Sequence, residues 1–205
     1  MLTDVTTLTV TEAAEARRSI RQYKDRAVPA EDMREILRIT GLAPSAFNVQ
    51  PWRFVVVEDA ETKAALQQAA FGQKQVGGAP AVVVLYSDMR DVMETLEETV
   101  HPGYGAEKRP AATEGVRKSL GGMSDEELRA WGAGQSYIAL GYLLLAAQSL
   151  GYSSSPMLGF DPAKVKEVLG LPEHVAIPAM VALGEADEAG FPHHRHPVER
   201  VASFR

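Results

Sequence analysis

The sequence predicts an α+β fold, because the helices it predicts outnumber the strands and the two kinds of element do not alternate strictly. The chain has 205 residues, 45% of them hydrophobic, which is typical of one compact domain. Residues 101–125 are polar and interrupted by glycine and proline. We therefore expect a single domain over residues 1–205, with an excursion over its surface at about 88–125.

The helix that follows Pro29 has the clearest signals. Acidic residues follow the proline, the apolar residues Met33, Ile36 and Leu37 have helical spacing, and Gly41 ends the pattern. The acidic segment at 88–98 also has helical spacing, and a solvated helix face explains it better than an acidic binding site. Further helices are expected at residues 12–20, 61–70, 126–150 and 162–169.

Short runs of β-branched residues predict three strands, at residues 53–58, 81–86 and 177–184. Pro178 is tolerated best if the third strand is an edge strand or if the proline lies at its beginning. We expect loops at residues 43–52, 71–80 and 152–160, and an irregular tail at 191–205. The helix at 126–150 is apolar around most of its circumference, so it should lie in the centre of the protein or between two subunits.

Composition excludes several classes of protein. The chain contains no cysteine, which excludes a disulfide scaffold, a catalytic thiolate and an iron–sulfur site. Its formal net charge is −6 with no sustained basic tract, which argues against nucleic acid as a partner. Residues 1–10 lack the features of a secretory signal, and the apolar stretch at 137–147 is about half as long as a bilayer span. We expect a cytoplasmic protein with no membrane partner.

Several common catalytic motifs are absent from the sequence. It has no phosphate-binding loop, no dinucleotide-binding glycine fingerprint, no zinc-peptidase helix and no nucleophile elbow. The histidine-rich run at 193–196 has an arginine between its imidazoles and no neighbouring acid, so we expect no metal. Redox or group-transfer chemistry would then have to come from a bound organic cofactor.

Three segments suit an anionic, planar cofactor. Residues 17–21 read Arg-Arg-Ser-Ile-Arg, and arginine forks match phosphate oxygens; if this segment is extended, Arg17, Ser19 and Arg21 point the same way. Residues 44–52 mix amide side chains with aromatic rings, and residues 153–159 are small enough to let backbone N–H groups approach a ligand. Alone, the first segment also fits a solvated basic face and the second a packed turn.

Together these segments resemble the nitroreductase family of FMN-dependent oxidoreductases, most closely its small bacterial NADH oxidases. The resemblance rests on the order and spacing of five motifs: R-R-S-I-R at 17–21, A-P-S-A-F-N-V-Q-P-W-R-F at 43–54, F-G-Q-K-Q-V at 71–76, P-M-L-G-F-D at 156–161 and H-R-H-P at 194–197. It implies a nitroreductase-like fold, with a central mixed or antiparallel sheet flanked by helices and a long central helix in a dimer interface. It also implies a homodimer with FMN bound between the subunits.

The resemblance assigns each motif to one part of the flavin. The phosphate and the pyrimidine edge would be met by Arg17, Arg18, Ser19 and Arg21, with His193 and Arg195 from the tail. The ribityl chain and the ring would be met by Gln73 and Gln75. The partner subunit would supply Pro44, Ser45, Ala46, Phe47 and Asn48. The N5 side of the ring would face Pro156, Met157, Leu158 and Gly159.

The implied reaction needs little side-chain acid–base chemistry. NADH or NADPH would pass hydride to flavin N5, and dioxygen, a quinone, a nitroaromatic or free flavin would accept it. The backbone of Leu158 and Gly159 would face N5, and Phe47 would stack or gate. Many relatives have glutamate at Leu158, lysine at Gln75 and His193, and related oxidases have tryptophan at Phe47. The alternatives are an enzyme that fragments reduced FMN and a flavin-binding protein without turnover.

Overall fold

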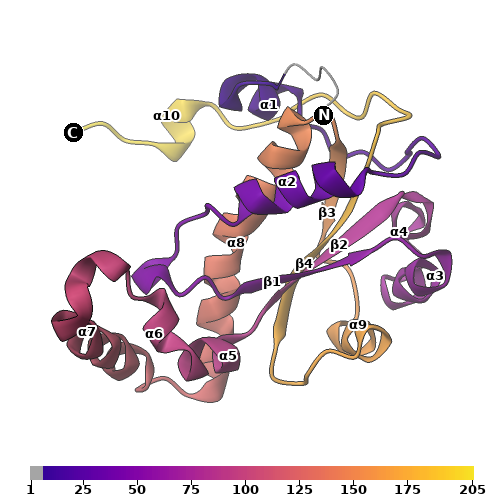
Figure 1. The fold of residues 1–205 in the computed structure, drawn as a ribbon. Coiled ribbons are helices and arrows are strands. Elements are labelled where there is room, and N and C mark those ends of the chain that lie inside the picture. Colours follow the sequence, from indigo (N-terminus) through magenta and orange to yellow (C-terminus); the bar gives the residue numbers. More distant parts are fainter. Residues whose placement is uncertain (1–6) are drawn as a thin grey trace.

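The computed structural model describes residues 7–205 and contains a four-stranded antiparallel sheet flanked by helices (Figure 1). The strands are β1 (Trp52–Val57), β2 (Ala81–Ser87), β3 (Ser153–Met157) and β4 (Ala176–Gly184), in the order β1-β2-β4-β3. All three neighbouring pairs are antiparallel. The α+β prediction and its antiparallel sheet are confirmed. No secretory signal is expected in residues 1–10, and residues 1–6 of that stretch lie outside the described part of the chain.

Strand β3 corrects the prediction of a loop at residues 152–160. Its Ser-Ser-Ser-Pro-Met sequence has little strand propensity, but it pairs with β4 from Ser153 opposite Gly184 to Met157 opposite Met180. The tertiary pairing outweighs the local preference. Pro156 is accommodated because β3 lies at the edge of the sheet order.

Strand β4 lies inside the sheet, between β2 and β3, so its proline is not explained by an edge position. Pro178 instead lies near the beginning of the strand, which was the other expectation. The register there is irregular: Leu85 pairs with Ala179 and Ser87 with Ala176. Two residues of β4 therefore oppose one of β2, a bulge that tolerates the missing N–H group.

Most helices lie close to their predicted positions. The bounds are α1 (Val10–Ala16), α2 (Ala30–Thr40), α3 (Ala60–Ala69), α4 (Lys74–Gly78), α5 (Met89–Glu94), α6 (Leu96–Thr99), α7 (Gly105–Leu120), α8 (Asp125–Ser149), α9 (Pro162–Leu169) and α10 (Val198–Val201). Short 3-10 helices occur at Ala46–Asn48 and Pro102–Tyr104.

Four segments differ from the sequence-based expectation. The first helix ends at Ala16, so residues 17–20 are not helical. Helix α4 lies in the predicted loop at 71–80, helix α7 lies in the polar segment at 101–125, and α10 lies in the irregular tail. Helix α7 even contains Pro110. Pro110 lies beyond the first turn of α7, so it removes one hydrogen bond within the helix, and local sequence preference does not explain the helix there.

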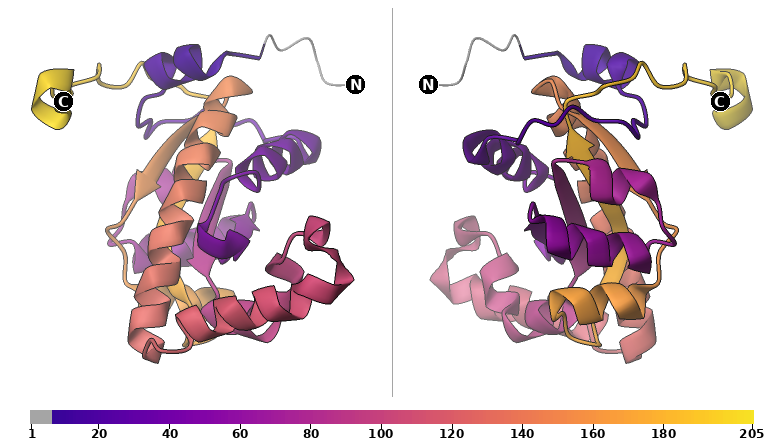
Figure 2. Two further views of the ribbon diagram at one scale, coloured as in Figure 1. Left: turned by 90° about the vertical axis from the view of Figure 1, so that its left-hand side faces the viewer. Right: turned by 90° about the vertical axis from the view of Figure 1, so that its right-hand side faces the viewer.

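Helices cover both faces of the sheet (Figure 2), and a hydrophobic layer lies between the helices and each face. Along β2, Val83 and Leu85 face α2 and α8, whereas Val82 and Val84 face α3 and α9. This alternation follows from the two-residue period of a strand. Helices α5 to α7 pack instead against the N-terminal part of α8, through a third cluster that includes Leu96 and Leu120. Within residues 7–205 no helix is long and apolar enough to cross a membrane.

Candidate cofactor site

Residues 17–21 form an extended segment beside β3. Ser19 makes a parallel bridge to Ser154, and the Ile20 N–H donates to the Ser154 carbonyl at 3.2 Å. The Ile20 side chain is buried, whereas Arg21 is exposed. Because side chains alternate along an extended chain, Arg17, Ser19 and Arg21 are directed away from the side on which Ile20 packs. The extended alternative considered for this segment is the one observed.

The guanidinium group of Arg17 is half-buried among other cations. Burial, together with the nearby charges of Arg195 and Arg18, lowers the pKa of Arg17 below its usual value. Its Nη1 atom is buried and has no hydrogen-bond partner among residues 7–205. Within that range no carboxylate forms an ion pair with Arg17, Arg18 or Arg195. A bound anion would satisfy this cluster.

The tail reaches the cluster because it crosses residues 17–21. The N–H groups of Arg21 and Gln22 donate to Glu188 Oε1 at 2.5 and 3.3 Å. Gly190 has φ +67°, and its Cα lies so close to the segment that an added Cβ would be 3.0 Å from Cβ of Arg18. Arg195 follows five residues later. His193 is exposed, and its assignment stays a prediction.

A second group of predicted residues meets at the end of β3. Gln73 Nε2 donates to the Gly159 carbonyl at 2.7 Å, and Gln75 Nε2 donates to Gln73 Oε1 at 3.0 Å. Gln75 is only 7% exposed, and Nε2 also lies 3.3 Å from the sulfur of Met157. Leu158 projects outward with 66% of its surface exposed. The beginning of α4 and the end of β3 thus form one amide-lined surface.

The loop that contains Pro44 lies apart from these groups. In Figure 1 its 3-10 turn lies beside α6, whereas α4 lies on the opposite side of the sheet. Phe47 is half-exposed there. Ala46 and Asn48 bond to Gln135 and Thr99, and Ser45 Oγ accepts from the Gln50 N–H. One chain therefore brings residues 17–21, 73–75 and 156–159 to one side of the sheet and residues 44–48 to the other, and Arg195 lies near Arg17.

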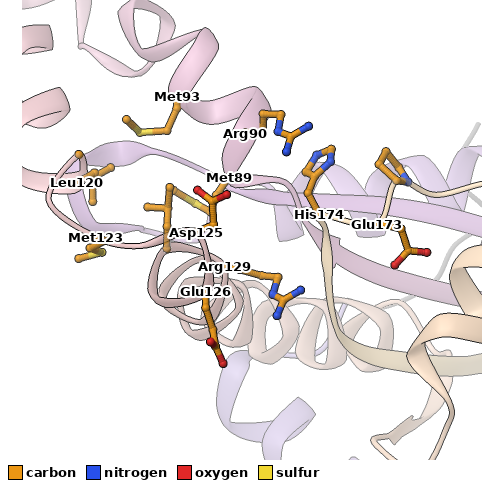
Figure 3. A pocket seen from close by; sticks show the side chains of 13 residues that line it. Met89, Arg90, Met93, Leu120, Met123, Asp125, Glu126, Arg129, Glu173 and His174 are labelled. Carbon is orange, nitrogen blue, oxygen red and sulfur yellow. The ribbon is translucent and has the colours of Figure 1, made fainter.

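A cavity of about 910 Å³ lies elsewhere, between α5, the beginning of α8 and residues 172–174 (Figure 3). Methionines 89, 93 and 123 line one part of it, and Arg90, Arg129 and His174 line another. His174 Nε2 lies 3.0 Å from Asp88 Oδ1. No predicted site residue lines this cavity. Its size suits a ligand, but its position separates it from the arginine cluster.

Three residues that contact the predicted segments were not proposed as site residues from the sequence: Glu188, Gln135 and Thr99. Each contacts a motif through a fold-dependent pairing between segments far apart in the chain. Gln135 had one usable signal, because it is a polar residue at the border of the apolar stretch at 137–147.

The chain is an α+β protein with a cluster of arginines that a bound anion would satisfy, and comparisons with known proteins identify the family. Residues 14–185 match the model of the nitroreductase family. A Thermus thermophilus protein named NADH dehydrogenase is 52% identical over 193 residues, which are 94% of each chain. Bacillus subtilis YdgI, provisionally named an NAD(P)H nitroreductase, is 30% identical over 204 residues, covering 95% of this chain and 96% of its own.

Solved structures agree with the family assignment. A protein of Exiguobacterium sibiricum, named as a nitroreductase and solved in complex with FMN, superposes with a TM-score of 0.88 at 29% identity. The match covers 98% of this chain and 99% of that one. The chain belongs to the nitroreductase family.

Proposed function

We propose that this protein is an FMN-dependent NAD(P)H oxidoreductase that passes reducing equivalents from NADH or NADPH to dioxygen, a quinone, a nitroaromatic or free flavin. The observation that carries the proposal is the half-buried guanidinium of Arg17, which lacks a partner among residues 7–205 and lies near Arg195 and Arg18. The names NADH dehydrogenase and NAD(P)H nitroreductase among the relatives, and the FMN complex of a structural neighbour, support it.

The arginine cluster fits the phosphate of FMN. Arg17, Arg18 and Arg195 supply positive charge, and the Ser19 hydroxyl can donate a further hydrogen bond. One terminal phosphate can pair with these arginines, and the sequence has no dinucleotide fingerprint. The site therefore favours FMN over FAD.

The amide-lined surface fits the rest of the cofactor. Gln73 and Gln75 orient each other and can meet the ribityl chain and the ring, while Met157 packs beside them. FMN bound there would supply hydride-transfer chemistry between the nicotinamide and the second substrate. The chain itself binds and orients the reactants, and we propose that the backbone of Leu158 and Gly159 positions the N5 edge. We assign the positive charge at the pyrimidine edge to Arg21, because Gln75 carries no charge.

We also propose a homodimer whose two sites are each built from both chains. The loop at 44–48 lies on the other side of the sheet from residues 17–21 and 73–75 of its own chain. A second copy can bring its loop to that site. Helix α8 supports this, because Tyr137, Ile138 and Tyr142 are exposed although each carries a large apolar surface. The tail extends away from the body with α10 near its end (Figure 2).

We propose one domain over residues 1–205 that acts in the cytoplasm, without a nucleic acid, a membrane or a metal as partner. The net charge of −6 supports the exclusion of nucleic acid. Cell fractionation with an antibody against the protein tests the location, and a membrane-bound pool would contradict it.

Flavin analysis of the purified protein tests the function. We expect a yellow protein that releases FMN on denaturation and that oxidises NADH or NADPH continuously, as followed at 340 nm with each acceptor. FAD, or no flavin uptake after addition of FMN, would refute the cofactor assignment. Binding without turnover would identify a flavin carrier, and flavin fragments detected by mass spectrometry after reduction in air would identify the fragmenting alternative.

A further inference from the structure

We propose that Gln135 and Asn48 are positioning residues that clamp Phe47 to helices α8 and α6, so that the helical excursion controls which acceptors reach the flavin of the partner subunit. The inference rests on the proposed function, because it assumes that the loop at 44–48 completes the partner's site. It adds residues and a specificity mechanism that the cofactor contacts alone do not provide.

The loop that carries Phe47 has an unfavourable backbone. Phe47, Asn48 and Gln50 have φ values of 56°, 57° and 44°, in the left-handed region that residues other than glycine rarely adopt. This conformation is unfavourable for L residues, and most so for a bulky aromatic residue. Three within four positions require the surrounding structure to hold them.

Two hydrogen bonds from distant elements hold the loop. The Ala46 N–H donates to Gln135 Oε1 on α8 at 2.9 Å. The side-chain amide of Asn48 donates to the Thr99 carbonyl, at the end of α6, at 3.0 Å. The two bonds flank Phe47 in the chain. The first bond fixes the backbone immediately before Phe47, and the second anchors the side chain of the residue that follows it.

A buried residue of the loop packs against the helices of the excursion, α5 to α7. Val49 is 3% exposed and belongs to the same hydrophobic cluster as Val92, Leu96 and Leu120. Trp131, one turn before Gln135 on α8, packs against this cluster. The loop, helices α5 to α7 and the N-terminal part of α8 thus form one packed unit, which Figure 1 shows to one side of the sheet.

The clamp presents an apolar ring that its own chain does not bury. Phe47 remains 50% exposed although its neighbour Val49 is in the core. A rigidly held ring excludes acceptors that are too thick or too wide to stack beside it. A loosened ring moves aside at little cost, so large planar acceptors gain access.

Paired substitutions at Gln135 test the clamp. Gln135→Leu removes the acceptor, whereas Gln135→Glu retains an oxygen that can accept the Ala46 N–H. Gln148→Leu makes the same chemical change near the other end of α8 and is the control. We expect the amides of residues 46–50 to exchange with deuterium about tenfold faster in Gln135→Leu, because one backbone hydrogen bond is lost. Gln135→Glu and Gln148→Leu should exchange like the wild type.

Steady-state kinetics test the specificity role on the FMN-loaded enzyme. The ratio of kcat/KM for menadione to that for benzoquinone should rise at least threefold in Gln135→Leu, mainly through KM for menadione. Asn48→Asp, which loses the donor to Thr99 but keeps a residue that tolerates a positive φ, should change the ratio in the same direction. The control should keep the wild-type ratio.

The outcomes separate this inference from the proposed function. Unchanged exchange in both Gln135→Leu and Asn48→Asp would overturn the clamp, whether or not the protein binds flavin. Faster exchange with an unchanged acceptor ratio would overturn the specificity role. Absence of flavin from the wild type would refute the proposed function and with it the specificity role, while exchange in the flavin-free protein would still decide the clamp.

Discussion

At the scale of single residues, Arg17 combines partial burial with a positive charge that other cations surround. A protein pays free energy to desolvate a cation without a partner, and like charges nearby add to that cost. The lowered pKa of Arg17 reflects both effects. We therefore expect a neutral side chain at this position to leave the ligand-free protein at least as stable, and a bound phosphate to offset the desolvation of Arg17.

Arg17→Met should consequently have opposite effects on folding and on cofactor binding. We expect an unchanged or higher midpoint of thermal unfolding for the flavin-free protein. FMN affinity should fall by about tenfold to a hundredfold, because one charge-assisted hydrogen bond is worth about 1.5–3 kcal/mol. Thermal unfolding without FMN and titration of flavin fluorescence measure the two quantities.

Arg34→Met is the matched control, since Arg34 is exposed on α2. It should leave both quantities close to the wild-type values. If Arg17→Met instead lowers the stability of the flavin-free protein and keeps FMN affinity, the arginine stabilises the fold rather than the cofactor.

Leu158 offers a second test at this scale. Its side chain is 66% exposed, so Leu158→Ala should preserve FMN binding and most of the rate at which NADH reduces the bound flavin. Leu158→Pro removes the N–H group that we propose lies near N5, so reduction should slow. Stopped-flow reduction measures both rates. The comparison is valid only if the proline variant keeps the wild-type FMN affinity and the wild-type molecular mass of the assembly. This control is needed because proline also restricts the backbone of Met157.

The opposite order of effects would contradict the assignment. If Leu158→Ala abolishes reduction and Leu158→Pro spares it, the main-chain amide at 158 does not face N5. The exposed leucine side chain would then have the role that we give to the backbone.

At the scale of elements, the site depends on a close crossing of the tail over residues 17–21. Gly190→Ala would place a Cβ 2.8 Å from Cδ1 of Ile20 and 3.0 Å from Cβ of Arg18, at a φ of +67°. We expect a loss of about 1–2 kcal/mol in the free energy of unfolding, because an L side chain is disfavoured in this conformation. FMN affinity should fall as well, since displacement of the tail moves Arg195.

Gly115→Ala is the control for Gly190→Ala. Gly115 lies inside α7, and an added Cβ meets no atom within 4 Å among the described residues. Alanine should stabilise the helix by about 0.5–1 kcal/mol and leave FMN affinity unchanged. Urea unfolding and flavin titration distinguish the two variants. Equal FMN affinity in Gly190→Ala and the wild type would mean that the crossing does not position Arg195.

The same elements show what the sequence could and could not predict. Helices α2 and α9 were predicted within a residue or two, because caps, acids and helical spacing are local signals. Strand β3 was missed because a serine-rich segment forms a strand only when β4 pairs with it. Helix α4 was missed because its two glycines oppose helix formation locally.

The candidate site likewise has features that the sequence predicts and features that it does not. Residues within one motif, such as 17–21 and 156–159, could be proposed from their chemistry and from the family resemblance. Contacts between segments could not, because the bonds from Ala46 to Gln135 and from Asn48 to Thr99 depend on helix packing. The burial of Arg17 is likewise a property of the fold.

At the scale of the whole molecule, the two groups of predicted site residues lie on opposite sides of the sheet in one chain. If each FMN site takes the arginine cluster from one copy and the loop from another, two defective chains can rebuild one complete site. Arg17→Met damages the first half of the site, and Ala46→Glu damages the second by placing a carboxylate on an exposed loop residue. Each variant alone should form dimers with weak FMN binding.

Coexpression of the two variants should restore binding. A mixed dimer contains one doubly damaged site and one site whose arginine cluster comes from the Ala46→Glu chain and whose loop comes from the Arg17→Met chain. We expect about one tightly bound FMN per mixed dimer, purified with two different affinity tags. A site built within one chain would be damaged in both copies, so mixed dimers without tightly bound FMN would show that the loop serves its own chain.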